Sequence, residues 1–349
     1  MDEYRKALTV WYNHTKRELP WRESRVPYHI WVSEIILQQT RVLQGMDYYH
    51  NFLKVFPSIE DLAEAPEEEI LKVWQGLGYY SRARNMHHAA KTIQSEHGGK
   101  FPTDYQSIRK LKGVGDYTAA AIASIAFGLP YAVVDGNVFR VLSRLFGIST
   151  PIDSSAGKKE FFNLAQMMLD TNHPGEFNQA LMEFGAIQCL PVQPLCQNCL
   201  LSKRCFAFIN QSVDSFPVKS KQAKQKDRYF NYLYMYHPNG FFLEKRGDKD
   251  IWRNMYQFPM IETVFPTSPE EIVSSTDWRK ILNNQTFTIE SISHERLHLL
   301  THQRLHIRFF SIRLDVNLKP DLFISVKQGD IARYPVPKPI EIFLKEVGH

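Results

Sequence analysis

The chain has 349 residues, of which 44% are hydrophobic and 23% are charged, and its formal net charge is +5. This length suffices for the cores of about two domains, and the positive charge is compatible with a polyanionic partner. No stretch approaches the roughly 20 apolar residues of a membrane span, and the N-terminus lacks a signal-peptide pattern. We therefore expect a soluble, cytoplasmic protein with no membrane partner.

An apolar rhythm at helical spacing predicts a first helix over residues 3–17, which Pro20 should end. A second helix, expected over residues 28–40, contains Glu34. The neighbours of Glu34 at three- and four-residue spacing share its side of the helix, namely Ile30, Trp31, Leu37 and Gln38. Loss of hydration on this largely apolar side should favour the neutral carboxyl. The alternative is a partly buried glutamate paired with an arginine.

Helices predicted over residues 41–55 and 58–73 lead to a stretch rich in glycine, tyrosine and arginine, Gly76-Leu77-Gly78-Tyr79-Tyr80-Ser81-Arg82. At the start of a helix that runs to Ile93, such a loop could carry aromatic wedges flanked by cations for binding a nucleic acid. The alternative is a glycine-rich helix connection whose tyrosines belong to the core.

A tight hairpin is expected at Gly113-Val114-Gly115, between helices predicted over residues 103–111 and 116–127. Two glycines allow a turn whose backbone N–H groups point outward, which suits a phosphate. The same pattern also occurs in ordinary turns between helices.

Asp135 lies immediately before a helix predicted over residues 138–146, where the positive end of the helix should favour the ionised carboxylate. An ordinary helix cap is the alternative. A neutral Glu34 and an ionised Asp135 would form a pair of an acid and a base or nucleophile. Chemistry at a glycosidic bond needs such a pair, because one group protonates the leaving group and the other stabilises an oxocarbenium-like sugar.

The four cysteines of the chain lie within 17 residues, at Cys189, Cys196, Cys199 and Cys205. Thiolates with this spacing can hold a [4Fe-4S] cluster or a zinc ion. Structural zinc sites usually show two short Cys-x2-Cys pairs, and only one is present here, so we favour the cluster. Lys203 and Arg204 would then face a phosphate backbone.

The C-terminal part begins with a basic stretch over residues 211–227, which we interpret as a solvated linker. Hydrophobic residues then alternate with a period of two and predict strands around Phe230 to Tyr236 and Phe241 to Arg246.

One further motif, His294-Glu295-Arg296-Leu297-His298, matches the H-E-x-x-H pattern of zinc proteases, and His302 and His306 extend its spacing. On a helix these histidines would form a metal face. The flanking residues 286–292 and 306–314 alternate as strands do, however, so a metalloprotease is only a minor alternative.

The hairpin, the Val-Asp-Gly-Asn-Val turn at residues 134–138 and the cysteine spacing together resemble the endonuclease III superfamily of DNA glycosylases. Three further motifs look like adenine DNA glycosylases of the MutY type: Leu19-Pro20-Trp21-Arg22, Ser33-Glu34-Ile35-Ile36-Leu37-Gln38-Gln39-Thr40 and the glycine-tyrosine stretch at residues 76–82. The resemblance covers residues 1 to about 210.

This resemblance implies two domains and a linker. An all-α helix-hairpin-helix catalytic domain with a [4Fe-4S] cluster loop would span residues 1–210, and an α+β Nudix-like domain that reads 8-oxoguanine would span residues 228–349, joined by the linker at 211–227. Trp252 to Pro259 resembles the Trp-x5-Phe-Pro element of that second domain. Because the acidic helix of active Nudix hydrolases is not visible, we expect recognition and not pyrophosphate hydrolysis.

The resemblance also assigns chemical roles. Glu34 would protonate adenine at N7, Asp135 would stabilise or capture the resulting sugar cation, and Tyr117 and Asn137 would orient that carboxylate. Bifunctional relatives have a Schiff-base lysine where this chain has Tyr117, so we expect removal of the base without cleavage of the strand. A bifunctional glycosylase/AP lyase, which would form a borohydride-trappable adduct, and a noncatalytic lesion-binding module are the alternatives.

The implied substrate is duplex DNA that contains adenine opposite 8-oxoguanine or guanine, bound by a monomer after extrusion of the adenine. Gln39 and Tyr79 would fill or wedge the base stack. Leu300-Thr301-His302 is the nearest match to the Phe-Ser-His loop that reads 8-oxoguanine in the family, with Leu300 in place of the aromatic residue. The adenine pocket and the remaining DNA contacts would involve Trp21, Arg22, Leu37, Thr40, Leu77, Ser81, Arg82, Gly113, Val114, Gly115 and Gln179.

Overall fold

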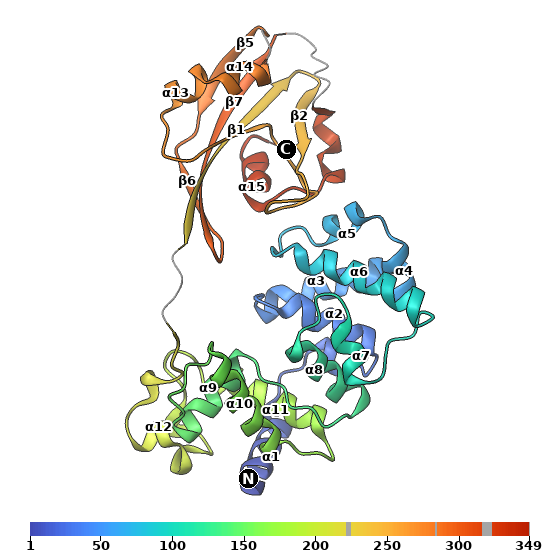
Figure 1. Ribbon diagram of the computed structural model, residues 1–349, viewed down its shortest axis with the longest axis vertical. Helices are drawn as coiled ribbons and strands as arrows, with labels where there is room; N and C mark the ends of the chain where they lie inside the picture. The colour runs from blue at the N-terminus through green and yellow to red at the C-terminus, as the bar shows by residue number, and fades with distance from the viewer. Residues whose placement is uncertain (221–224, 283–284, 316–322, 349) are drawn as a thin grey trace. The chain divides into compact units, whose positions relative to one another are not determined.

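The computed structural model describes residues 1–220, 225–282, 285–315 and 323–348 (Figure 1). The chain divides into two compact units, the first made of residues 1–65 and 84–221 and the second of residues 66–83 and 222–349. The short segment 66–83 therefore belongs with the C-terminal residues although it lies early in the chain. The domain division predicted from the sequence did not include this exchange.

The first unit is helical. Its elements are α1 (Asp2–Thr15), a 3-10 turn (Pro20–Arg22), α2 (Pro27–Leu37), α3 (Val42–Val55), α4 (Ile59–Glu64), most of α6 (Ser81–Glu96), α7 (Tyr105–Lys110), α8 (Asp116–Phe127), α9 (Gly136–Phe146), α10 (Ser155–Met168), α11 (Pro174–Ile187) and α12 (Phe206–Ile209).

Two helices differ from the sequence prediction, and both differences have a local cause. The helix expected over residues 28–40 ends at Leu37, because Gln39 has a left-handed backbone with φ of 59°. The helix expected over residues 58–73 is split at Pro66 into α4 and α5 (Glu67–Val73), since proline lacks the N–H that a continuous helix needs.

Packing of α8 brings distant parts of the first unit together. This helix is alanine-rich and is buried over its middle, and it contacts both α2 and α11. Small side chains allow the close approach: a Cβ on Gly175 of α11 would lie 2.7 Å from the carbonyl oxygen of Ser124. Residues of α2, α8 and α11 can therefore line one site.

The second unit is built on a mixed sheet. Its strands are β1 (Lys226–His237), β2 (Gly240–Lys245), β3 (Tyr256–Gln257), β4 (Met260–Thr263), β5 (Phe287–Ile292), β6 (Arg296–Leu299), β7 (Gln303–Leu314) and β8 (Ile324–Val326). The main order is β3-β2-β1-β7-β5, in which β1 and β7 run parallel from Lys226 beside Gln303 to Tyr236 beside Arg313. The helices of this unit are α5, α13 (Pro269–Ser274), α14 (Thr276–Leu282) and α15 (Lys338–Glu346).

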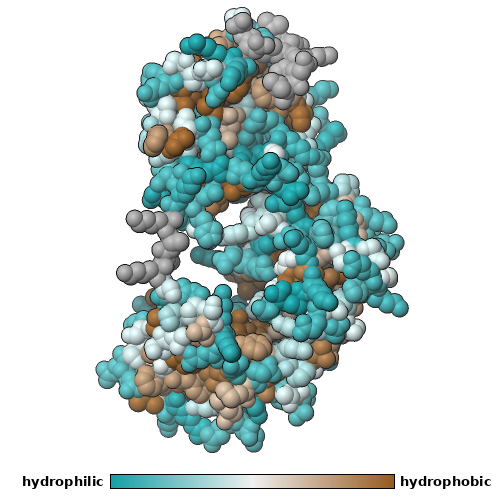
Figure 2. Space-filling view, viewed as in Figure 1, coloured by the Kyte–Doolittle hydropathy of each residue, from teal (hydrophilic) through white to brown (hydrophobic). Residues whose placement is uncertain are grey.

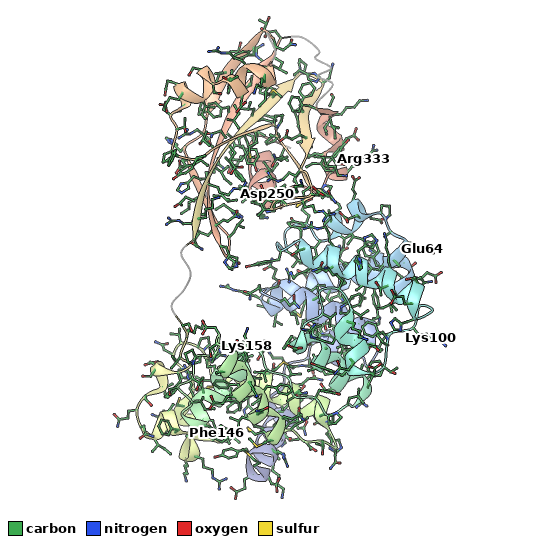
Figure 3. The ribbon with its side chains drawn as sticks, viewed as in Figure 1. Glu64, Lys100, Phe146, Lys158, Asp250 and Arg333 are labelled. Atoms are coloured by element: carbon green, nitrogen blue, oxygen red, sulfur yellow. The ribbon has the colours of Figure 1, made fainter. Side chains whose placement is uncertain are left out.

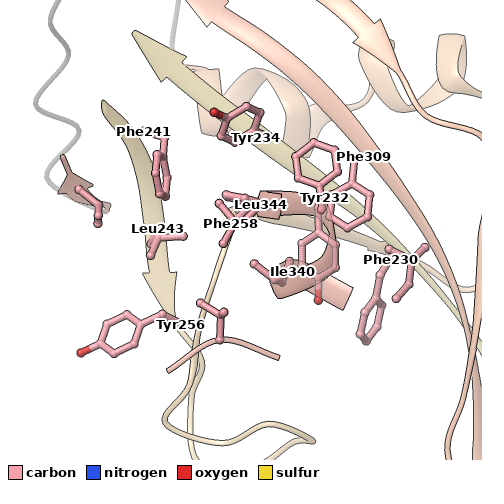
Figure 4. Close-up of a cluster of buried hydrophobic side chains, with 14 of the residues drawn as sticks. Phe230, Tyr232, Tyr234, Phe241, Leu243, Tyr256, Phe258, Phe309, Ile340 and Leu344 are labelled. Carbon is pink, nitrogen blue, oxygen red and sulfur yellow. The ribbon is translucent and has the colours of Figure 1, made fainter. Parts of the chain in front are cut away.

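Each face of this sheet has its own core, so the central strands are buried on both sides. Aromatic residues of β1, β2 and β7 pack against Ile340 and Phe343 of α15 (Figure 4). The opposite face packs against Trp278 and Leu282 of α14. The α+β class expected for this domain is thus confirmed, and the surface of the unit visible in Figure 2 is mostly hydrophilic.

Ion pairs in the second unit connect the start of β1 with β4 and with the segment that follows β2. Asp250, labelled in Figure 3, accepts both a hydrogen bond from Arg228 Nη2 at 2.7 Å and one from Arg246 Nη2 at 2.6 Å. Arg228 also donates to Glu262 at 2.7 Å. Because Arg228 and Arg246 have largely buried side chains, their pairing offsets the cost of removing them from water.

The H-E-x-x-H motif does not lie on a helix. Arg296 opens β6, and His306 lies on β7 between Glu295 and Asp227, to which its ring nitrogens make contacts of 2.7 and 3.0 Å. Among the described residues, no three His, Cys, Asp or Glu side chains are grouped so that they could hold a metal ion. The strand interpretation of this region is confirmed, and the metalloprotease alternative is removed.

Described residues of the stretch interpreted as a solvated linker make specific contacts. The amide of Ser220 donates to Asp153 at 2.9 Å, and the carbonyl of Val218 accepts from Ile152 at 3.0 Å. β1 already begins at Lys226. Residues 221–224 lie outside the described part of the chain. None of the described helices is long and apolar enough to cross a membrane.

We predict that Phe309→Ala lowers the free energy of unfolding of the second unit by about 3–5 kcal/mol. The ring is buried and stacks on Phe343 at 4.1 Å between centroids and on Tyr232 at 5.5 Å. Chemical denaturation would measure the loss. Phe265→Ala is the control, because the Phe265 side chain is exposed and should leave stability nearly unchanged; equal losses would contradict the prediction.

Candidate active site

Glu34 is a buried carboxyl in the middle of α2. It is 7% exposed, and the Tyr117 hydroxyl of α8 donates to its Oε2 at 2.6 Å. Burial raises the pKa of Glu34 to about 7, an effect that the Tyr117 hydrogen bond opposes and the charge of Asp135 supports. Near neutral pH a large share of the molecules therefore has a protonated Glu34. The sequence had assigned Tyr117 to orient Asp135, whereas the structure places its hydroxyl on Glu34.

Asp135 is the N-cap of α9. Its Oδ1 accepts from the amide of Val138 at 2.8 Å and its Oδ2 from the side chain of Asn137 at 2.7 Å. Burial raises the pKa of Asp135, although these hydrogen bonds and the charge of Arg140 act in the opposite direction. The cap that the sequence predicted is present, but it does not outweigh the burial, so the net pKa shift is opposite to the one we expected.

Arg140 joins this carboxylate to the cysteine-rich loop. Its Nη2 donates to Asn137 Oδ1 at 2.8 Å and to the carbonyl of Gly185 at 2.6 Å, and its Nε donates to the carbonyl of Cys189 at 2.7 Å. Asn137 therefore bonds Arg140 through its oxygen and Asp135 through its nitrogen. Sequence reasoning missed Arg140, although its position on α9, five residues after Asp135, puts it within reach of the same site.

Glu34, Tyr117 and Asp135 line a single cavity of about 210 Å³ in the first unit. The residues predicted for the adenine pocket line the same cavity, namely Trp21, Arg22, Leu37 and Gln179, as do the predicted catalytic residue Asn137 and the predicted DNA contact Thr40. The cavity is also lined by residues that the sequence did not indicate: Arg17, Ile125, Met182 and Glu183. The structure thus gathers side chains from α2, α8, α9 and α11 around one space.

A second buried glutamate in this cavity is ionised. Glu183 accepts from Arg17 and from Arg22, each at 2.7 Å. Burial alone would raise the pKa of Glu183, but the two arginines outweigh it and hold the pKa at about 2. Glu183 follows Gln179 by four residues on α11, so helical spacing could have indicated it. Its arginine partners, more than 160 residues earlier, gave no such signal.

Gln179 also has a fixed neighbour. The hydroxyl of Tyr12, a buried residue of α1, lies 3.0 Å from Gln179 Oε1, and the guanidinium of Arg22 lies 5.5 Å from the centre of the Tyr12 ring. The amide of Gln179 is thus held at the cavity wall.

The glycine hairpin has the predicted tight turn, but one amide is already used. Gly113 has φ of 82°, and a Cβ at this position would lie 2.6 Å from Cβ of Asn85. The Val114 side chain is buried, and its N–H donates to the carbonyl of Leu111 at 3.0 Å. The Val114 amide therefore closes the turn and does not point to a phosphate.

The four cysteines line one cavity whose remaining walls are largely apolar, including Val141, Leu145, Phe184, Leu201 and Phe208. All four thiols are free and partly buried. Four thiols around one apolar cavity match the ligand set of an iron-sulfur cluster.

Arg144 closes this cavity from the side of α9. The guanidinium is buried and lies 3.5 Å from Cys189 Sγ, and it donates to carbonyl oxygens of Leu190, Pro191 and Val213. A buried cation is placed where thiolate charge would otherwise be uncompensated.

Of the other predicted DNA contacts, Gln39 lies in the first unit and the rest lie in the second. Tyr79 has φ of 48°, its ring is half exposed, and its hydroxyl lies 3.1 Å from Thr301 Oγ1. Arg82 donates to the carbonyls of Leu77 and Gly78, and burial lowers its pKa to about 10. Ser81 begins α6. Thr301 and His302 are exposed at the β6–β7 turn, whereas Leu300 packs against the core shown in Figure 4.

The fold and the site define a class. The family profile of HhH-GPD superfamily base excision DNA repair proteins matches residues 32–165, and the NUDIX domain profile matches residues 231–346. A solved thermostable thymine-DNA glycosylase is 32% identical, with a TM-score of 0.56 over 60% of this chain and 96% of its own. The chain is therefore a base excision repair enzyme of the helix-hairpin-helix superfamily that carries a Nudix-like domain.

Sequence relatives narrow the class further. The adenine DNA glycosylase of Buchnera aphidicola subsp. Acyrthosiphon pisum is 33% identical over 314 residues, which cover 89% of this chain and 87% of the relative. The adenine DNA glycosylase of Homo sapiens is 44% identical over 213 residues, which cover 58% of this chain and 39% of the relative. This chain belongs to the adenine DNA glycosylase family.

We predict that Gly185→Ala lowers both stability and glycosylase activity. The added Cβ would lie 2.6 Å from Asn137 Cβ and 2.9 Å from its carbonyl oxygen, so Asn137 must move away from Asp135. Single-turnover kinetics and thermal unfolding would measure the two effects. Gly247→Ala is the control, because a Cβ there meets nothing within 4 Å; unchanged activity in Gly185→Ala would refute the prediction.

Proposed function

We propose that this protein removes adenine mispaired with 8-oxoguanine or guanine in duplex DNA, with Glu34 as the acid and Asp135 as the anion at the sugar. The observation that carries this proposal is the pairing, in one cavity, of a buried Glu34 that keeps its proton near pH 7 with an Asp135 held by a helix N-terminus. Two carboxyls with different roles are what cleavage of a glycosidic bond requires.

In the first step Glu34 donates its proton to N7 of an extruded adenine. Protonation withdraws electrons from the bond between C1′ and N9, which then breaks and leaves its electron pair on the adenine. Tyr117 donates to Oε2 of Glu34, so Oε1 is the oxygen that carries the transferable proton. The residues around the base, Trp21, Arg22, Leu37 and Gln179, hold it against Glu34 and exclude water.

In the second step Asp135 stabilises the cationic sugar or forms a covalent ester at C1′, which a water molecule then hydrolyses. Asn137 and the Val138 amide fix both oxygens of Asp135 in place, so no reorganisation is needed as positive charge develops. Arg140 orients Asn137 and thereby acts as a positioning residue.

The absence of an amine at the site supports a monofunctional enzyme. Formation of a Schiff base needs a lysine within reach of C1′. Among the described residues that line the cavity there is no lysine, and Tyr117, at the position of the lysine in bifunctional relatives, bonds to Glu34.

Two residues with strained backbones support the assignment of the DNA wedges. Gln39 and Tyr79 both have positive φ, at 59° and 48°, which costs about 1–3 kcal/mol for a residue with a side chain. Such strain is common at functional sites. Gln39 and Tyr79 would enter the base stack, with Leu77, Ser81, Arg82 and the Gly113-Val114-Gly115 turn near the phosphates, while Leu300, Thr301 and His302 would read 8-oxoguanine.

The four cysteines would hold a [4Fe-4S] cluster in the apolar cavity described above. When bound, this group would fix the loop at residues 189–205 and with it the surface that carries Lys203 and Arg204. Arg144 would offset part of the negative charge. The protein would act as a monomer.

The test of the proposed function is single-turnover release of adenine from a labelled duplex with adenine opposite 8-oxoguanine, with an A:T duplex as control. Glu34→Gln should slow release by about 10²–10⁴-fold, because the amide cannot supply the proton. Since Glu34 must be protonated and has a pKa of about 7, the wild-type rate should fall about tenfold per pH unit above 8, and it should fall again at acid pH, where Asp135, whose pKa burial raises, becomes protonated. Release from A:T, or an unimpaired Glu34→Gln enzyme, would refute the assignment.

We also predict that His302→Ala weakens the preference for 8-oxoguanine over guanine opposite the adenine. The side chain is exposed at the β6–β7 turn, and its backbone carbonyl accepts from Lys226 at 3.0 Å, so truncation should not disturb the fold. The ratio of single-turnover rates on the two duplexes measures the preference. His294→Ala removes another exposed histidine of the same region and serves as control. An unchanged ratio in His302→Ala would contradict the assignment of His302 to recognition of 8-oxoguanine.

A further inference from the structure

The segment 66–83 is attached to the C-terminal residues by the acidic first turn of α5. This turn contains three consecutive glutamates at 67–69. Oε1 of Glu68 accepts two hydrogen bonds, from Lys245 Nζ and from the Tyr256 hydroxyl, both at 2.6 Å. One carboxylate oxygen therefore joins α5 to β2 and β3 at the same point.

Tyr256 provides a rigid anchor for this contact. Its ring belongs to the buried core of the second unit and packs edge-on against Tyr334, while its hydroxyl points out of the cluster (Figure 4). Lys245 lies over the same ring at 5.4 Å from its centre. The Glu68 contacts thus orient the first turn of α5 against groups that have little freedom of their own.

Two more contacts hold α5. Asn254 donates from Nδ2 to Glu67 Oε1 at 2.6 Å, and it is fixed in a left-handed backbone with φ of 61° by a bond from its amide to the carbonyl of Arg246. At the other end of α5, Lys72 Nζ lies 3.4 Å from the carbonyl of Tyr334. The helix is therefore held at both ends by C-terminal residues.

The loop that carries Tyr79 follows α5 directly and is internally braced. The indole of Trp74, the residue after α5, donates to the carbonyl of Gly78 at 3.1 Å. The guanidinium of Arg82 lies over the rings of Trp74 and Tyr79, at 5.2 and 5.5 Å from their centres. The far end of this loop meets the β6–β7 turn through Tyr79 and Thr301.

We propose that Glu67 and Glu68 are positioning residues that hold the Tyr79 loop against the β6–β7 turn, and we call their contacts the latch. The turn that reads the base opposite the adenine and the tyrosine that enters the base stack then move together as one rigid body. This inference rests on the proposed DNA contacts of Tyr79, Thr301 and His302. A single exposed ion pair stabilises little. Here the carboxylate is shared between a cation and a hydroxyl anchored in the core, and neighbouring contacts act on the same helix.

If the latch exists, neutralising Glu68 should lower the preference for A:8-oxoguanine over A:G and not only the rate of adenine release. When Glu68 is neutral, the Tyr79 loop moves independently of the turn that reads the opposite base, so binding of 8-oxoguanine at the turn no longer positions the loop and the lesion duplex loses its advantage. Glu68→Gln should lower the ratio of single-turnover rates on A:8-oxoguanine and A:G by about threefold to tenfold, chiefly by slowing the lesion duplex, with thermal stability unchanged.

Glu290→Gln is the matched control. Glu290 also accepts from a tyrosine hydroxyl, that of Tyr236, and from a cation, Arg313, and its side chain is similarly exposed, at 44% against 47% for Glu68. It contacts β1 and β7, however, and not α5. Its ratio should equal that of the wild type. An unchanged ratio in Glu68→Gln, or an equal fall in Glu290→Gln, would overturn the latch.

A second measurement does not depend on catalysis. Hydrogen exchange of the free protein should show faster exchange in residues 66–83 of Glu68→Gln than of the wild type, with no change in the Glu290→Gln control. Unchanged exchange would also overturn the latch.

The double variant Glu68→Gln with Tyr79→Phe should lose no more discrimination between the two duplexes than either single variant, because both substitutions act through the contact between Tyr79 and Thr301. Additive losses would show that Glu68 does not act through this contact. If the wild type fails to release adenine from the lesion duplex, the proposed function fails, and the exchange experiment still tests the latch.

Discussion

The loss of hydration around Glu34 is the constraint on which the rest of the site depends. Two buried glutamates line the same cavity, yet burial raises the pKa of Glu34 to about 7 while Glu183 has a pKa of about 2. The difference comes from their partners. Glu183 meets two guanidinium groups, whereas Glu34 receives only the neutral Tyr117 hydroxyl. The charge of Arg22 also lowers the pKa of Glu34, but burial outweighs it.

The same logic explains why Asp135 needs so many contacts. A buried carboxyl cannot rely on hydration, and the oxygens of Asp135 accept hydrogen bonds from an amide and from Asn137. Arg140 then connects Asn137 to the carbonyl of Cys189. The position of the cysteine loop and the position of the Asp135 carboxylate are therefore mechanically linked through two side chains.

The sequence was most informative where chemistry depends on residues close together in the chain. Helical spacing around Glu34, the Asp-Gly turn at Asp135 and the period of two in β7 all predicted local environments that the structure has. Pairings between distant residues were missed, such as Glu183 with Arg17, since periodicity within one helix does not identify a partner on another. Tyr117 was predicted to be in the site but was given the wrong carboxylate, because α2, α8 and α9 meet only through tertiary packing.

The exchange of residues 66–83 between units could not be predicted for a related reason. Pro66 could have indicated the break between α4 and α5, but nothing in Glu67 or Glu68 shows that they bond to Asn254 and Lys245, which are 187 and 177 residues away. Three adjacent glutamates at the start of a helix are also typical of a solvated first turn that complements the helix dipole. Only the structure distinguishes these two uses of the same residues.

Gln39 and Tyr79 both have a left-handed backbone, and different contacts support it in each case. Gln39 lies within a turn closed by the bond from the Thr40 amide to the carbonyl of Leu37, and the neighbouring Gln38 is joined to Thr118 of α8. Tyr79 is supported by Arg82 and by Thr301 at the β6–β7 turn. Because a left-handed backbone persists only where its surroundings over-determine it, the backbone of Gln39 and that of Tyr79 are each held by contacts within their own unit.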